Sequence, residues 1–225
     1  MINEFQFNEI KEKTVETLQL LLITSVLILV LGIIIGCLLY LTDRRYFEYK
    51  TKKIDVIHQG LSVVVNALRT IPFIVLAALL IPVNLNIMGT FIGVKGAIIP
   101  IVLSAAPFFA RITYNSLISI NAGVNEALRS MGASKLRVIC TILKESLPAL
   151  IEGFTLTLIT LVGFITVAGA IGAGGLGDLA QRYFFNGGDR TRAAGFLIVV
   201  ILLSFVFTTQ IIGDLIAKKI RKKRN

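Results

Sequence analysis

The sequence predicts an all-α integral membrane protein with five transmembrane helices and a helical loop on the cytoplasmic side. Three observations lead to this fold class. Apolar residues make up 55% of the 225 residues, and the mean hydropathy is +0.82, which is above the apolar share of an ordinary soluble domain. These residues gather in long segments that polar stretches separate. The net charge is +10 although only 16% of the residues are charged, so the basic residues are concentrated where the chain leaves the bilayer.

The first transmembrane helix is expected at 18–41, an apolar run long enough to cross a hydrocarbon core of about 30 Å. Residues 1–17 are polar and contain four glutamates, so they lack the basic start of a cleavable signal peptide. We therefore expect the first apolar run to stay in the mature protein, with 1–17 as an external N-terminal segment.

The segment 54–83 is too long for one straight crossing of the membrane. Pro72 lies near its middle, where the ring must break the helical hydrogen-bond ladder. We expect a short helix here, followed by a kinked second span.

The third span is expected at about 96–117, and it contains Pro100 and Pro107. Prolines are tolerated in membrane helices where neighbouring helices or water satisfy the freed backbone groups. Kinks of this kind suit a helix that lines a pathway, although packing explains each proline alone equally well.

Residues 121–148 form the longest polar stretch between spans, but apolar residues recur there at helical spacing, which predicts a structured helical loop. The fourth span is expected at about 149–171 and the fifth at about 193–216, with a glycine-rich and polar loop between them. The transmembrane domain therefore covers 18–217, and 218–225 form a basic cytoplasmic tail.

Lysines and arginines predict the orientation, because positive residues stay on the cytoplasmic side of a membrane. One side carries 16 of them, in the loop after the first span, the long helical loop and the tail. The other side carries 6 of them, and Arg69 is assigned to neither side because it lies within the second apolar segment. Five spans with the N-terminus outside and the C-terminus in the cytoplasm satisfy this bias at every loop.

The pattern of charge also excludes other partners. The basic residues flank apolar runs and form no soluble basic face. We therefore expect the protein to lie in a lipid bilayer and not to bind nucleic acid. Cys37 and Cys140 lie far apart, and no residues have metal-ligand spacing. Neither a disulfide framework nor a metal site is expected.

A motif in the helical loop has the features of two short helices joined by a turn. Gly132 can adopt the left-handed conformation that ends one helix, and Ser134 can cap the next. Pro148 suits the first turn of the fourth span. Glu126 and Arg129 lie three residues apart on one helical face, so both charges can meet one partner surface.

The string Asn-Glu-Ala-Leu-Arg-Ser-Met-Gly-Ala-Ser at 125–134, followed by Leu-Pro at 147–148, resembles the EAA loop of ABC importer permeases. In that family this loop docks in a groove on the ATPase. Leu128 replaces the second alanine of the usual pattern, and Leu-Pro comes about three residues late. A loop that lies on the membrane surface, with Glu126 merely solvated, is the alternative. The resemblance implies a coupling role for Glu126, Ala127, Arg129, Gly132, Ala133 and Ser134.

A glycine-rich string at 172–177 satisfies the pattern G-x-G-x-x-G of dinucleotide-binding loops. That fingerprint must follow a strand and open a helix, whereas this string follows a long apolar run on the predicted external side. Its glycines are expected to end the fourth span and to let backbones pack closely. The alternative is a flexible external mouth where substrate enters. The residues of this candidate mouth are Gly172, Gly174, Gly175, Gly177 and Asp178.

Further strings are similar to those of methionine importer permeases: Arg-Thr-Ile-Pro-Phe at 69–73, Ala-Pro-Phe-Phe-Ala-Arg at 106–111, and Gln210 through Asp214. The resemblance implies a homodimer, two copies of a cytoplasmic ATPase, and an external lipoprotein that delivers methionine. The chain lacks a Walker G-x-x-x-x-G-K-[ST] motif, so ATP and Mg are expected on the partner ATPase and no cofactor on this chain. Permeases for glycine betaine, other osmoprotectants or phosphonate remain alternative readings.

Polar and kinking residues within the spans are candidates for the pathway or its gate. Arginines can equally snorkel to the headgroups, and hydroxyls more often bond their own helix backbone. A membrane enzyme would need convergent acids, histidines or a nucleophile, which the apolar runs do not supply. A structural subunit would tolerate loss of Glu126 or Gly132. The pathway candidates are Arg69, Pro72, Ser104, Pro107, Arg111, Thr157 and Thr160.

Overall fold

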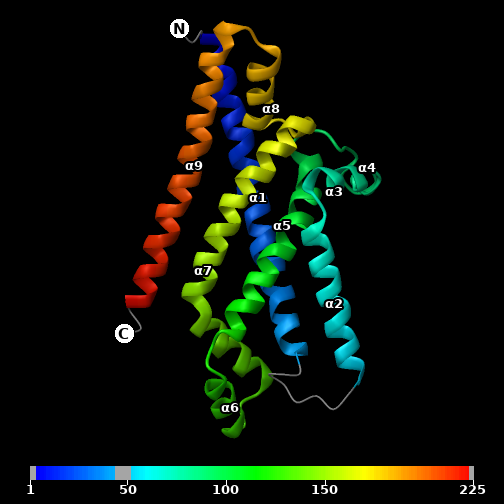
Figure 1. The fold of residues 1–225 in the computed structure, drawn as a ribbon, viewed down its shortest axis with the longest axis vertical. Coiled ribbons are helices and arrows are strands. Elements are labelled where there is room, and N and C mark those ends of the chain that lie inside the picture. The colour runs from blue at the N-terminus through cyan, green and yellow to red at the C-terminus, as the bar shows by residue number, and fades with distance from the viewer. Residues whose placement is uncertain (1–3, 44–51, 223–225) are drawn as a thin grey trace. The chain divides into compact units, whose positions relative to one another are not determined.

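The computed structural model describes residues 4–43 and 52–222, and these residues form helices without a single strand. The chain can be followed from one helix to the next in Figure 1. Predictions that concern 1–3, 44–51 and 223–225 fall outside the described residues. The elements are α1 (Glu4–Thr42), α2 (Lys52–Thr70), α3 (Phe73–Leu79), α4 (Ile81–Met88), α5 (Gly93–Ile118), α6 (Ala122–Ser130), α7 (Lys135–Ala168), η1 (Gly169–Ala173), α8 (Gly175–Gln181), η2 (Arg182–Asn186) and α9 (Asp189–Lys222).

Within residues 4–43 and 52–222, four helical segments are long and apolar enough to cross a membrane. They are α1, α5, α7 continued through η1, and α9. A fifth crossing is formed if α2 and α3, which meet at a bend of 109°, count as one broken span. The described part of the chain therefore confirms the predicted all-α membrane fold, and the predicted five spans are reached when this bent pair is counted as one span.

The second span differs from its prediction in one respect. The break at Pro72 is confirmed, but the longer helix precedes the proline: α2 has 19 residues, whereas α3 and α4 have 7 and 8. The expected order, a short helix before the main span, was wrong. Pro72 has an extended ψ of 136° and constrains the residue before it, so the chain turns sharply before α3 begins.

Helices α1 and α5 agree with their predicted spans. α5 runs unbroken through Pro100 and Pro107, within a few residues of its expected bounds. α1 contains the whole first span, and its helix already begins at Glu4. Residues 4–17 of the predicted N-terminal segment are therefore helical and continuous with that span.

The long loop is helical as predicted, but one of its boundaries is wrong. α6 is a separate short helix, whereas the second loop helix and the fourth span form one helix, α7. Pro148 lies inside α7 and not in its first turn. A proline inside a helix removes one backbone hydrogen bond, and membrane helices tolerate this loss where other groups satisfy the freed carbonyl.

The chain divides into two compact units, and each has its own core. The first contains residues 1–27, 71–105 and 158–210, and the second contains 28–70, 106–157 and 211–225. One buried cluster in the core of the first unit consists of Ile10, Leu176, Leu179, Tyr183, Ala194 and Ile198. A buried cluster in the core of the second unit consists of Leu39, Tyr40, Val65, Tyr114, Leu117, Val138, Ile139 and Ile142.

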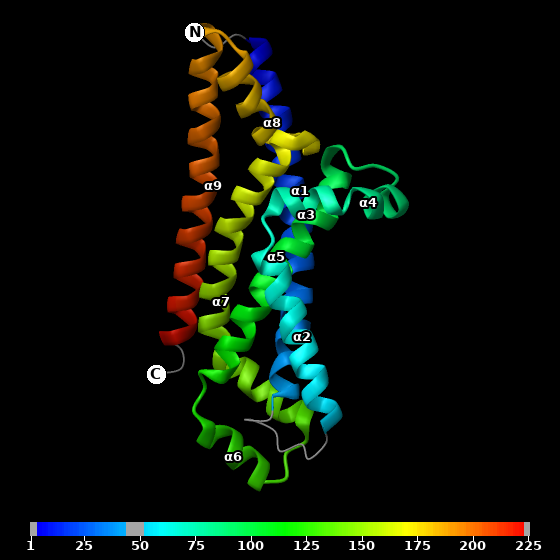
Figure 2. The same cartoon turned by 45° about the vertical axis from the view of Figure 1, so that its right-hand side comes forward.

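Two arrangements within these units position the candidate sites. In the first unit α8 lies beside the early turns of α1, as Figure 2 shows. In the second unit α6 follows α5 and precedes α7, so it connects two of the helices that supply the core (Figures 1 and 2).

Candidate functional site

The loop between α5 and α7 is a helix, a turn and a second helix start, each with a local cause. The Asn121 side chain caps α6 by accepting a hydrogen bond from the Gly123 backbone N–H at 2.9 Å. Gly132 then has a φ of +74°, a conformation that L side chains rarely adopt. Ser134 Oγ accepts a bond from the Arg137 N–H at 3.4 Å at the start of α7. The predicted roles of Gly132 and Ser134 in the local structure are confirmed.

The same loop has one face held by the protein and one face exposed. Leu128 and Ala133 pack against the core of the second unit. Glu126, Ala127 and Arg129 are exposed. The apolar anchors fix the loop in place, so that the two charged residues are presented to the surroundings.

Two large apolar side chains flank the turn and are exposed as well. Met131 is 74% exposed and Leu136 is 76% exposed. They belong to the helically spaced apolar residues of this loop, of which Leu128, Ile139 and Leu143 contribute to the core instead. Exposed apolar side chains between charged ones are typical of a surface that another protein covers.

The glycine-rich string forms an irregular connection between α7 and α8. Gly172, Gly174 and Gly175 have φ values of +108°, +78° and +73°. The string follows a helix, so the structure lacks the strand that a dinucleotide fingerprint requires, and the predicted failure of that reading is confirmed.

Two glycines of this region let backbones approach closely, which was predicted for Gly177 but not for Gly169. A Cβ on Gly177 would overlap the backbone carbonyl oxygen of Thr166. A Cβ on Gly169 would lie 2.7 Å from the Gly174 carbonyl oxygen and 2.7 Å from the Asp178 backbone nitrogen. α8 is thus pressed against the end of α7 at positions where only glycine fits.

The first turn of α8 is held by α1, a contact that sequence reasoning missed. Glu16 Oε2 accepts a hydrogen bond from the Gly175 N–H at 2.7 Å, and Thr17 Oγ1 accepts one from the Leu176 N–H at 2.8 Å. Lys13 Nζ holds the other carboxylate oxygen of Glu16 at 2.7 Å. The partners are 159 residues apart in the sequence, so no local pattern could have indicated this contact.

We expect Glu16→Ala to lower the stability of the region around α8, because the Gly175 N–H and Lys13 would lose their shared partner. Loss of a charge-assisted bond of this kind costs about 1–2 kcal/mol. Glu12→Ala is the matched control, since Glu12 is an exposed glutamate one helical turn earlier. Thermal unfolding of the purified protein in detergent measures the difference. Equal melting temperatures for the two variants would contradict the capping role of Glu16.

A small polar network continues the contact between α1 and the end of α8. Arg182 donates to Glu9 Oε1 at 2.9 Å and to Asp178 Oδ2 at 3.0 Å, and Tyr183 Oη donates to Glu9 Oε2 at 2.8 Å. Burial alone would lower the pKa of Arg182, but Asp178 and then Glu9 outweigh it and raise that pKa. Burial and the bond to Glu9 raise the pKa of Tyr183 to about 12. Both groups therefore stay protonated at physiological pH.

The two candidate arginines of the pathway each lie over an aromatic ring of α5. The Arg69 guanidinium carbon is 5.7 Å from the centre of the Phe108 ring, and that of Arg111 is 4.9 Å from the centre of the Tyr114 ring. Arg69 is exposed, and Arg111 is half-buried. These contacts stabilise the charges by cation–π attraction.

The other pathway candidates are not gathered in one cavity. Thr157 is buried and donates to the Gly153 carbonyl oxygen at 2.8 Å, so it bonds its own helix. Ser104 is buried, and its hydroxyl has no hydrogen-bond partner among the described residues. Thr160 is half-buried, Pro72 marks the break before α3, and Pro107 lies within α5.

The second unit contains a buried carboxylate that the sequence did not single out. Asp43 is 4% exposed and accepts a hydrogen bond from Tyr114 Oη at 2.5 Å. Nearby, Thr42 Oγ1 and His58 Nδ1 are 3.1 Å apart. Among the described residues no three His, Cys, Asp or Glu side chains converge as metal ligands.

Comparison with known proteins identifies what the chain is similar to. The family model described as binding-protein-dependent transport system inner membrane component matches residues 54–222. The chain is 38% identical over 208 residues to the probable D-methionine transport system permease protein MetI of Pasteurella multocida, covering 92% of this chain and 93% of that protein.

Two further similarities extend this result. The chain is 41% identical over 189 residues to the methionine import system permease protein MetP of Bacillus subtilis, covering 83% of this chain and 82% of that protein. Among solved structures, an inward-facing conformation of the MetNI methionine ABC transporter has a TM-score of 0.89 and 35% identity, covering 97% of this chain and 99% of that one.

Proposed function

The chain belongs to the family of binding-protein-dependent transport system inner membrane components, and we propose that it imports methionine as the membrane-spanning subunit of an ATP-driven transporter. It is a multi-pass membrane permease component and not an enzyme. The methionine assignment is supported by curated relatives that are 38% and 41% identical and are described as methionine permeases. The same relatives favour methionine over glycine betaine, other osmoprotectants or phosphonate.

The observation that carries the coupling part of this proposal is the surface around Gly132. The positive φ of this residue turns the chain between α6 and α7. Exposed Met131 and Leu136 flank the turn, and exposed Glu126 and Arg129 lie on the preceding helix. An apolar centre with charges at its edge is suited to docking on an ATPase.

The partners follow from the same proposal. Two copies of the chain would form the conduit, each bound to one copy of a cytoplasmic ATPase that holds ATP and Mg. An external lipoprotein would deliver the substrate to the segment between 172 and 178. The lack of a Walker motif in this chain supports the need for a separate ATPase.

The orientation and the pathway are part of the proposal as well. With the N-terminus outside and the C-terminus in the cytoplasm, the docking surface lies on the side of the ATPase, in agreement with the distribution of basic residues. The pathway or its gate would use Arg69 and Arg111, whose charges lie over aromatic rings of α5. Ser104, Thr157, Thr160, Pro72 and Pro107 are the further candidates.

Methionine uptake into proteoliposomes tests the function. The vesicles contain the chain with its ATPase, and the binding protein is added on the outside. We expect uptake of radiolabelled methionine that requires ATP and that excess unlabelled methionine prevents. Uptake of betaine or phosphonate in place of methionine would contradict the substrate. A complex that assembles without binding any ATPase would indicate a structural subunit instead.

A further inference from the structure

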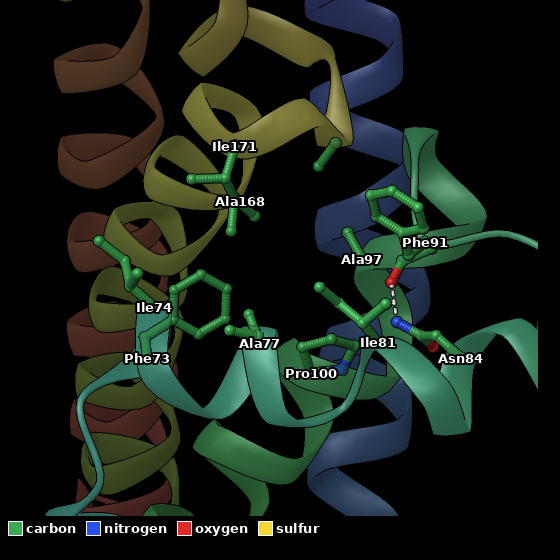
Figure 3. Close-up of a pocket in the computed structure, with 13 residues that line it drawn as sticks. Phe73, Ile74, Ala77, Ile81, Asn84, Phe91, Ala97, Pro100, Ala168 and Ile171 are labelled. Carbon is green, nitrogen blue, oxygen red and sulfur yellow. Dashed lines mark hydrogen bonds between the residues drawn. The ribbon is translucent and has the colours of Figure 1, made fainter.

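The first unit contains an apolar cavity that the candidate sites above do not use. Its volume is about 200 Å³, and part of its wall is open. Figure 3 draws the 13 residues that line it and labels ten of them. They come from α3, α4, α5, the segment that joins α4 to α5, and the end of the fourth span in α7 and η1.

The cavity exists because small residues form much of its wall. Ala77, Gly96, Ala97, Ala168 and Ala173 all line it. Leucine or phenylalanine at these positions would fill the space, as happens at most positions of a close-packed interior. For comparison, an apolar cavity of about 150 Å³ is large enough to bind benzene.

The remaining wall is apolar and partly aromatic. Phe73 and Phe91 contribute rings, and Ile74, Ile81 and Pro100 contribute aliphatic surface. One face of Phe73 already stacks on Phe164 with ring centres 5.3 Å apart, which fixes the ring in place. The described lining contains no charged side chain, so the wall is unsuited to a phosphonate or another multiply charged group.

Asn84 supplies the only polar side chain of the described lining. It is 2% exposed, and its Nδ2 donates to the Gly96 carbonyl oxygen at 2.6 Å. Its Oδ1 is buried and has no hydrogen-bond partner among the described residues. A buried carbonyl of this kind is costly unless a donor reaches it, so a ligand with an N–H group would satisfy it.

We propose that this cavity is a transient site for the amino-acid substrate, with the thioether side chain against the aromatic wall and the α-ammonium group donating to Asn84 Oδ1. This inference rests on the proposed import of methionine. A thioether is apolar and polarisable and makes favourable contacts with aromatic rings. The charged carboxylate stays at the open part of the wall, where water can solvate it.

A site of this volume would favour side chains of a limited size. A cavity with one polar atom and weak contacts can take up a small apolar group and release it again. An unbranched, flexible side chain enters such a space at little cost, whereas a group larger than the cavity does not enter. The site therefore adds a second check on the substrate after the external binding protein.

Photolabelling of the wild-type complex tests the proposal directly. The probe is a methionine analogue in which a diazirine replaces the thioether sulphur, added to the complex of chain, ATPase and binding protein. We expect the label on peptides that contain residues 73–100 or 168–173, and at least tenfold less label with excess methionine. Label confined to other parts of the chain overturns the proposal. Label on these peptides that excess methionine does not reduce also overturns it, because the cavity would then not bind methionine specifically and would instead suit the acyl chain of a lipid.

A pair of alanine substitutions provides the second test. Ala77→Leu fills the cavity, and Ala170→Leu makes the same change in η1 at an exposed position outside the lining. We expect Ala77→Leu to import methionine about tenfold more slowly than Ala170→Leu, the effect of a few methylene groups in a specific pocket. Co-purification with the ATPase checks that each complex assembles. Equal uptake by the two variants overturns the proposal.

The two tests separate this inference from the proposed function. If the wild-type complex imports methionine but the cavity is neither labelled nor sensitive to Ala77→Leu, the function holds and the site is wrong. If the wild-type complex does not import methionine at all, the function itself fails.

Discussion

We expect Gly132→Pro to abolish ATP-dependent methionine uptake and to release the ATPase from the complex. Proline requires a φ near −65°, whereas Gly132 has a φ of +74°. Proline also removes the N–H that donates to the Arg129 carbonyl oxygen at 2.9 Å. Both changes prevent the turn between α6 and α7, so the exposed residues on either side can no longer form one docking surface. Uptake into proteoliposomes and co-purification with the ATPase measure the two effects.

Gly132→Asn is the matched control for this experiment. Asparagine tolerates the left-handed conformation better than other residues with a side chain. A Cβ at this position would meet no atom within 4 Å, so space is not limiting. We expect the asparagine variant to keep most of its uptake. Wild-type uptake by the proline variant would show that the turn is not required for coupling.

Gly177→Ala is expected to have the largest effect on stability. A Cβ at Gly177 would overlap the backbone carbonyl oxygen of Thr166, and neither backbone can rotate away as a flexible side chain could. α8 must therefore move away from α7. Overpacking of this severity costs about 3 kcal/mol or more, and we expect a melting temperature far below that of the wild type and poor assembly of the complex.

Gly163→Ala makes the same chemical change without the clash. Gly163 lies in α7 and is exposed, and a methyl group added to its Cα would meet no atom within 4 Å. Alanine favours a helix over glycine by about 1 kcal/mol, so this variant should be as stable as the wild type or slightly more stable. Thermal unfolding of both variants in detergent, followed by size-exclusion chromatography, compares them. Similar melting temperatures would show that α8 and α7 are not in close backbone contact.

The spans and the docking loop could be predicted because their causes are local. Apolar runs of membrane length, the break at Pro72 and the turn at Gly132 each depend on residues next to one another in the sequence. The prediction failed at Pro148, because the second loop helix continues through this proline into the fourth span and a proline can occupy a helix interior as well as its first turn.

The capping of α8 and the cavity could not be predicted, because both depend on residues far apart in the sequence. Glu16 and Gly175 are 159 residues apart. Asn84 became significant only when the structure showed its carbonyl oxygen buried without a partner among the described residues. In the sequence it is one polar residue in an otherwise ordinary segment. The roles of the pathway and coupling residues in transport remain predictions for the experiments above.

The contact between α1 and α8 has a consequence for the order in which the protein folds. Glu16 and Thr17 are synthesised early, but the backbone N–H groups that they bind, at Gly175 and Leu176, emerge from the ribosome only after most of the chain. The contact closes a long loop and therefore forms late. During synthesis the side chains of Glu16 and Thr17 therefore lack these two donors until the segment after the fourth span has been made. That segment reaches its final conformation only when it packs against the N-terminal helix.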